Sequence, residues 1–198
     1  MNIKIENIAD IFVGRANGVY KREGVAESDP LLLQGADISK DGEMTTKNMI
    51  RVKITSTRNL DPYFLKPNDV VILSRGSSIR ACYIDKEIGN AKVLASANTI
   101  IIRTNKEKIR GEVLAAYFNS EVGKDSLQAS STGAVIHHIP ASVLRNIEIP
   151  LPSKQKQDNI AELFYAGREA YKSTLTLAEQ QKKTVEAKMI DLMQGAES

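Results

Sequence analysis

The chain has 198 residues, a hydrophobic fraction of 42% and a formal net charge of +3. This length supports one hydrophobic core, or one core with an appendage, and the composition is that of a soluble globular protein. No apolar run approaches the roughly 18 residues that span a bilayer, and the first residues lack the apolar core of a signal peptide. We therefore expect a cytoplasmic protein with no membrane partner. Cys82 is the only cysteine, which excludes an intramolecular disulfide and a cysteine-based metal site.

The positive charge is unevenly placed. Residues 153–198 carry seven Lys or Arg and seven Asp or Glu, so the whole excess lies in residues 1–152. An excess this small permits a nucleic-acid partner but does not demonstrate one.

The first half of the chain predicts short strands separated by polar turns. Residues 3–12 alternate weakly, which fits a strand or a short helix leading into one. Residues 30–35 indicate a buried strand, and residues 36–46 a turn. In residues 49–55 three β-branched apolar residues alternate with Arg51 and Lys53, which predicts a half-buried strand with a basic open face.

The second half predicts strands followed by helices. Residues 70–73 are an apolar run typical of a buried strand, and they lead directly into a polar loop. Further strands are predicted at 79–84, as a hairpin partner, and at 92–97 and 99–103. Helices are predicted at 108–119 and 120–129, with a helical turn at 140–145 that begins with proline.

A long helix is predicted for the C-terminal part of the chain. Pro150 and Pro152 lack an N–H and end the strand-like run before them. Ser153 is a candidate N-cap, followed by an exposed first turn at 154–158 and a helical pattern to Met193. Some 36 helical residues span about 50–55 Å, too long to bury against a domain of about 150 residues.

This helix should project and bind a partner, and a helix folded back on its own domain is the alternative. A seven-residue repeat supports the first reading, because it is typical of helices that pack along their length. Gly167, Thr174, Gln181 and Lys188 also lie on the repeat and make the seam impure. The domain boundary is placed between residues 1–152 and 153–198. The candidate residues for dimerisation through a coiled coil are Ile160, Leu163, Phe164, Tyr171, Leu175, Ala178, Val185, Met189 and Leu192.

Catalytic motifs are absent from the sequence. The glycine spacing fits neither a dinucleotide-binding fingerprint nor a P-loop, and no Gly-x-Ser-x-Gly elbow occurs. His137 and His138 are adjacent, so on a strand they point to opposite faces, which suits a structural or DNA-facing role better than chelation. We interpret Cys82 as a thiol in the hydrophobic core. We expect no enzyme activity, no metal and no cofactor.

The loops between the predicted strands are rich in residues that bind DNA. Arg and Lys contact phosphate and guanine, Asn and Gln read adenine, and Ser and Thr bind either groove edges or phosphate. The densest case is Ser74-Arg75-Gly76-Ser77-Ser78-Ile79-Arg80. An ordinary polar hairpin loop is the alternative reading of this segment.

Several segments resemble one half of a specificity subunit of type I restriction-modification systems. Residues 65–77 are similar to the family's "L-x-x-G-D-I-L-x-S-x-x-G" segment, with Asn68 in place of the usual glycine. The junction from Ile147-Glu148-Ile149-Pro150-Leu151-Pro152 into the helix is the most specific part. The resemblance covers most of residues 60–194 and includes the segments 96–103, 117–120, 139–152 and 155–163.

The resemblance implies an α+β fold with two parts. The first is a β-rich target-recognition domain with mixed and antiparallel pairing and short helices, which reads one part of a split DNA sequence. The second is one long projecting C-terminal coiled-coil helix. In the family such helices pair antiparallel as a spacer and dock methyltransferase subunits. Catalysis, S-adenosylmethionine and ATP belong to other subunits, including the restriction and translocase subunit.

A full subunit of the family has two domains and two long helices, whereas this chain has one of each. The hypothesis is that two copies pair through their helices at residues 158–193 as a two-fold homodimer on double-stranded DNA. Two alternatives stay open: a decoy half-subunit that binds methyltransferase subunits without reading DNA, and a recognition domain separated from a self-contained methyltransferase. Arg75 and Arg80 rank highest among the candidate DNA contacts, which are Arg15, Lys21, Arg22, Lys47, Arg58, Ser74, Arg75, Ser77, Ser78, Arg80, Asn98, Ser131, Thr132, His137 and His138.

Overall fold

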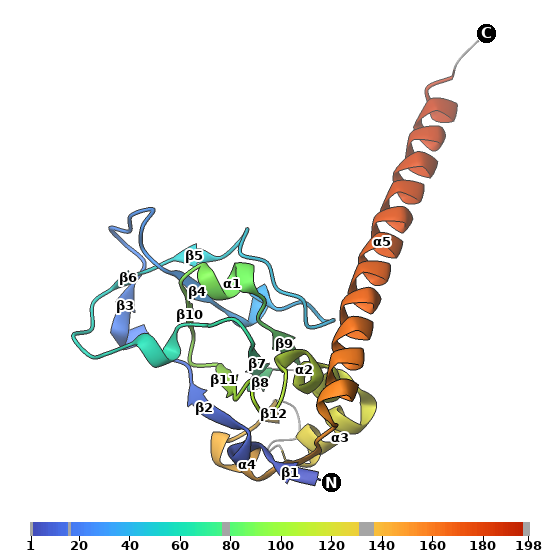
Figure 1. Cartoon of the computed structure of the whole chain (residues 1–198). Helices are drawn as coiled ribbons and strands as arrows, with labels where there is room; N and C mark the ends of the chain where they lie inside the picture. The colour runs from blue at the N-terminus through green and yellow to red at the C-terminus, as the bar shows by residue number, and fades with distance from the viewer. Residues whose placement is uncertain (1, 16, 77–79, 131–136, 196–198) are drawn as a thin grey trace.

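A four-stranded antiparallel sheet, in the order β2-β11-β7-β9, lies at the centre of the fold (Figure 1). The computed structural model describes residues 2–15, 17–76, 80–130 and 137–195. The strands of this sheet are β2 (Ala9–Val13), β7 (Asp69–Leu73), β9 (Ala81–Tyr83) and β11 (Thr99–Thr104). Every residue of β7 is buried. Val70 and Ile72 enter one core cluster and Val71 enters another, because both faces of the sheet are covered.

Short strands pair around this sheet. A three-stranded sheet of order β10-β4-β5 combines one parallel and one antiparallel pairing, and three two-stranded pairs are β1–β13, β12–β8 and β3–β6. These strands are β1 (Asn2–Lys4), β3 (Tyr20–Lys21), β4 (Leu31–Leu33), β5 (Ile50–Arg51), β6 (Lys53–Ile54), β8 (Arg75–Gly76), β10 (Val93–Ala95), β12 (His137–His138) and β13 (Glu148–Pro150).

Short helices cover the sheet, and one long helix leaves it. The short helices are η1 (Ile5–Asn7), η2 (Asn17–Val19), η3 (Gly35–Asp37), η4 (Asp61–Tyr63), α1 (Lys86–Asn90), α2 (Gly111–Asn119), α3 (Glu121–Ala129) and α4 (Ala141–Asn146). The long helix α5 (Lys154–Met193) has 40 residues and projects from the rest of the chain, as Figure 1 shows in orange and red. This architecture confirms the predicted α+β fold.

Most of the predicted elements are present, with two differences in the strands. The predicted strand at 49–55 is two strands, β5 and β6, because the fully buried Val52 lies between them and donates its N–H to Pro30 O. Residues 3–12 contain a strand, a 3-10 turn and a second strand.

Helix α5 begins where the sequence predicts, directly after Ser153, although this serine makes no side-chain capping bond. The first turn at 154–158 is exposed as predicted except at Gln157, which is only 1% exposed. Its side chain accepts the N–H of Arg110 and donates to the carbonyls of Lys108 and Pro152. From Tyr171 to Met193 every residue is exposed, so the helix does not fold back on its own domain.

Candidate nucleic-acid interface

One end of the central sheet gathers several candidate DNA contacts. The register pairs Val13 with Ile100, Thr99 with Leu73, and Ile72 with Ala81, so these strand ends lie together. The segments that continue from these ends carry Arg15, Ser74, Arg75, Arg80 and Asn98. Residues far apart in the sequence therefore form one polar edge.

Arg15 is fixed at this edge by its backbone and its side chain. Its N–H donates to Ala95 O at 2.9 Å, and its guanidinium lies 4.7 Å from the centre of the Tyr63 ring. Its buried Nε has no hydrogen-bond partner within the described part of the chain. A buried donor without an acceptor costs free energy. Since this atom is buried, any DNA contact of Arg15 would use the other nitrogens of its guanidinium.

Ser74 and Asn98 differ in accessibility. Ser74 is 3% exposed and its hydroxyl donates to Asn98 O at 3.0 Å, so the prediction of Ser74 as a DNA contact is corrected to a structural role. The hydroxyl holds the turn between β10 and β11 against the end of β7. Asn98, on that turn, is exposed.

The backbone also brings the two histidines to this edge. His137 pairs with Gly76 and His138 with Arg75 in the β8–β12 ladder, and Ile139 N–H donates to Ser74 O. The predicted loop around Arg75 and the predicted histidine strand are therefore neighbours. The candidates Ser77, Ser78, Ser131 and Thr132 lie outside the described residues.

Arg80 has a structural contact that the sequence does not reveal. One Nη of its half-buried guanidinium donates to Ile38 O at 2.8 Å. This bond ties the start of β9 to the segment after η3. Replacement of Arg80 would therefore disturb packing as well as any DNA contact.

A second basic group lies on the β3–β6 ribbon. Lys21 and Lys53 are directly opposite each other and both are exposed. Arg22 follows Lys21 and donates to the Gln34 side chain at 3.3 Å, and the exposed Arg58 follows β6. Like charges facing each other across a ribbon are destabilising, so this placement suits an anionic ligand. Lys47 is separate from both groups and lines a hollow beside α5.

Lys53 was not among the candidates, although the alternation of Arg51 and Lys53 with apolar residues indicated a basic face. Only the register shows that Lys53 faces Lys21, which lies 32 positions earlier in the sequence.

We expect the double variant Lys21→Ala/Lys53→Ala to bind DNA more weakly at every sequence. Each lost phosphate contact should lower the slope of log affinity against log salt by about one. Binding titrations at several salt concentrations measure this slope. Lys124→Ala, an exposed lysine on α3, is the matched control and should leave the slope unchanged. An unchanged slope in the double variant would remove the ribbon from the interface.

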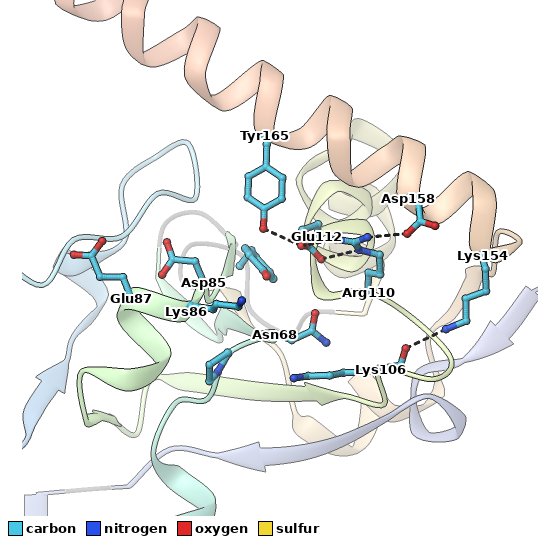
Figure 2. Close-up of a pocket in the computed structure, with 12 residues that line it drawn as sticks. Asn68, Asp85, Lys86, Glu87, Lys106, Arg110, Glu112, Lys154, Asp158 and Tyr165 are labelled. Carbon is cyan, nitrogen blue, oxygen red and sulfur yellow. Dashed lines mark hydrogen bonds and ion pairs between the residues drawn. The ribbon is translucent and has the colours of Figure 1, made fainter.

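A charged network fixes the base of α5 to α2, beside a cavity of about 690 Å³ (Figure 2). Tyr165 and Asp158 come from α5, and Figure 2 shows both directed at residues that open α2. Tyr165 Oη donates to Glu112 at 2.8 Å, and Arg110 bonds Glu112 at 3.3 Å and Asp158 at 2.7 Å. Burial alone would raise the pKa of Glu112, but the bonds from Arg110 and Tyr165 outweigh it and hold that pKa below its ordinary value.

This depressed pKa predicts acid sensitivity at the base of α5. A carboxylate whose pKa is lowered by folding stabilises the native state above its ordinary pKa, and this contribution is lost as the pH falls through the folded pKa. We expect wild-type stability to fall more steeply than that of Glu112→Gln below about pH 4.5. Urea unfolding between pH 3 and pH 7 measures the difference. Parallel curves for the two proteins would contradict the prediction.

Two further sequence predictions concern Cys82 and metal binding. Cys82 is buried, and burial raises the pKa of its thiol to about 12, so it is a core thiol. Among the described residues no group of His, Cys, Asp or Glu has the arrangement of a metal site. Within the same part of the chain, no helix is long and apolar enough to cross a membrane.

Comparison with known proteins adds to this geometry. The family model described as "Type I restriction modification DNA specificity domain" matches residues 26–187. The chain belongs to this family. The specificity subunit of the type I restriction enzyme MjaVIII from Methanocaldococcus jannaschii is 26% identical over 113 residues, which are 57% of this chain and 24% of that subunit.

Solved structures of specificity subunits share the fold. The S subunit of a type I restriction-modification system from M. genitalium matches with a TM-score of 0.57 and 14% identity, over 92% of this chain and 42% of that one. The HsdS subunit from Thermoanaerobacter tengcongensis matches with a TM-score of 0.55 and 19% identity, over 87% and 38%. The chain thus spans less than half the length of these relatives.

Asn68 shows how this specificity domain accommodates its departure from the resembled motif, which usually has glycine. The residue has φ of 77°, a left-handed conformation that glycine and asparagine adopt most readily. Its side-chain oxygen accepts the N–H of Gly111 at 2.9 Å, and its amide nitrogen donates to Thr104. Asparagine therefore keeps the turn and adds a tether to the first residue of α2.

Proposed function

We propose that this chain is a non-catalytic DNA-recognition subunit of a type I restriction-modification complex. It reads one part of a bipartite target, and two copies join through α5. The observation that carries the proposal is the exposed half of α5, which presents an unpartnered apolar line beside a domain with two basic groups. The family match supports the DNA-reading role.

The apolar line begins where α5 leaves the domain. Ile160 and Phe164 pack against the core of their own chain, so the surface open to a second chain starts near Tyr171. Beyond it, apolar residues follow the alternating spacing of four and three that is typical of coiled coils. These residues are Tyr171, Leu175, Ala178, Val185, Met189 and Leu192, and all are exposed.

This spacing leaves out Thr174, Gln181 and Lys188, which lie on the seven-residue repeat. Its one polar position is Lys182. A lysine at a seam position lowers stability but restricts register and partner. In a parallel pair it would face its own copy, which is repulsive. An antiparallel pair avoids this contact and gives a two-fold complex suited to an inverted repeat.

The DNA side of the proposal rests on two separate basic groups. The sheet edge carries Arg15 and the exposed Asn98, and the ribbon carries Lys21 and Lys53. Phosphate contacts position a protein on the duplex, and base contacts give sequence preference. We assign the phosphate contacts to the ribbon and the base contacts to the sheet edge. Methyltransferase subunits, and through them the restriction and translocase subunit, are the proposed protein partners.

Selection from a random pool of double-stranded DNA tests this function. The chain is mixed with methyltransferase subunits, and the bound DNA is sequenced. The expected product is an inverted repeat with a spacer of fixed length. A complex that forms but enriches no sequence would indicate a decoy and overturn the proposal. The Arg15→Ala variant should lose preference at individual positions while still joining the complex.

A further inference from the structure

A hollow of about 810 Å³ lies between segment 39–47 and the part of α5 from Tyr165 to Glu179. We call it the shoulder groove. Met44, Ile88 and Leu175 contribute apolar surface to it, and Lys172 lies on its α5 side. Figure 1 shows the segment after η3, in light blue, reaching toward α5.

The wall of the shoulder groove is held in place from both sides. Ser39 Oγ accepts the N–H groups of Asp41 and Glu43 at 3.2 and 3.1 Å, which closes the segment into a tight turn. Tyr171 Oη on α5 donates to Asp41 at 2.9 Å, and Arg168 forms an ion pair with Glu43. The groove is therefore preformed in the single chain.

Gly42 sets how closely this turn approaches the sheet. It has φ of 76°, and a Cβ at this position would lie 2.4 Å from Ala81 O. Only glycine meets both conditions without strain. The turn thus rests directly on β9 and cannot swing away from α5 without breaking this contact.

The end of α5 carries two exposed apolar residues that are not part of the apolar line. Ile190 is 51% exposed and Met193 is 83% exposed. Positions seven apart lie on one line along a helix, so Met193 continues the line of Tyr165, Lys172 and Glu179. Ile190 likewise continues the line of Glu169 and Thr176. Both lines border the shoulder groove at their other end.

We infer that the shoulder groove receives the last turn of α5 from a second copy, with Met193 and Ile190 as the inserted side chains. This inference rests on the proposed antiparallel dimer. In an antiparallel coiled coil, a line of residues that flanks the seam on one helix faces the same line of the other helix. The line that borders the groove in one copy therefore meets the line ending at Met193 in the other.

The register agrees with this placement. Centring the pair near residue 180 sets Tyr171 opposite Met189 and Leu175 opposite Val185 of the second copy. The same register sets Ala178 opposite Lys182 of the second copy, so the long lysine side chain lies beside a small residue. The last turn of the second copy arrives beside Arg168, at the groove. On the groove side Lys172 meets Glu186 of the second copy twice, by symmetry, and these two opposite-charge pairs flank a single like-charge contact between the two Glu179 residues.

Cross-linking between differently tagged full-length chains tests the inference, with Cys82→Ala in both. One chain carries Thr45→Cys at the groove and the other Met193→Cys, and a short bis-maleimide joins nearby thiols. Residue 193 lies 22 positions beyond Tyr171, about 33 Å along the helix, so a link within one chain cannot form. We expect at least ten times more product than with the control Leu177→Cys, which is exposed on the opposite face of α5.

The outcomes separate this inference from the proposed function. A dimer by light scattering without the Thr45–Met193 product overturns the groove assignment and leaves dimerisation standing. A monomer overturns both. A Leu175→Cys chain that links to itself indicates parallel pairing and also overturns the assignment. In addition, Ile190→Asp/Met193→Asp should weaken dimerisation at least tenfold, and an unchanged dissociation constant would contradict insertion.

Discussion

Replacing Leu175 and Val185 with aspartate should convert the proposed dimer to a monomer. Both side chains are about half exposed in the single chain, so pairing would remove their remaining apolar surface from water. Each substitution occurs twice in a two-fold dimer, and the lost burial amounts to about 4 kcal/mol, or roughly a thousandfold in the dissociation constant. Light scattering over a concentration series measures this change.

The matched control is Leu177→Asp, on the opposite face of the same helix, where Leu177 has a similar exposure. It should leave the dissociation constant within a factor of about two. Circular dichroism checks that helix content is retained in all three proteins. If Leu175→Asp/Val185→Asp remains dimeric at the same concentrations, the apolar line is not the pairing surface.

Gln157→Leu should destabilise the domain by about 3–4 kcal/mol, a large effect for one residue. The leucine would keep the volume but leave three backbone groups without partners, at Lys108, Arg110 and Pro152. Buried backbone groups that lose a partner cost about 1–3 kcal/mol each. Because these bonds join α5 to the segment before α2, the base of the helix should also become more susceptible to proteolysis.

Urea unfolding at pH 7 measures the effect of Gln157→Leu, and Gln155→Leu is the control. Gln155 lies on the same turn, is exposed and bonds only to Asn159 in the structure described. The control should change stability by no more than about 0.5 kcal/mol. Equal stabilities of the two variants would show that solvent replaces the bonds of Gln157.

The central strands and the long helix were predictable because their patterns are local. Residues 70–73 are apolar throughout, since both faces of β7 are covered. The pattern of α5 extends over 40 residues without proline, so its beginning and end were also predicted well. By contrast, α1 has five residues, fewer than two turns, and gives no periodic signal.

The sequence indicates which residue types could form a DNA interface, but it does not give their geometry. Arg15, Asn98 and Lys21 have chemistry that suits DNA, and Asn98 and Lys21 are exposed. Ser74 failed because polar loops near strand ends can be buried by contacts from distant segments. The same reason explains Gln157, which looks like an exposed helical residue but bonds to segments nearly 50 positions away.

The pairing of β1 with β13 brings the two ends of residues 2–150 together, with Asn2 opposite Pro150. A polypeptide fused ahead of residue 2 would therefore enter beside the point where α5 leaves. Domains whose ends are adjacent tolerate insertion into other chains and circular permutation. We therefore expect that residues 2–150 can be transplanted onto another helical spacer with the strand order of their sheets unchanged.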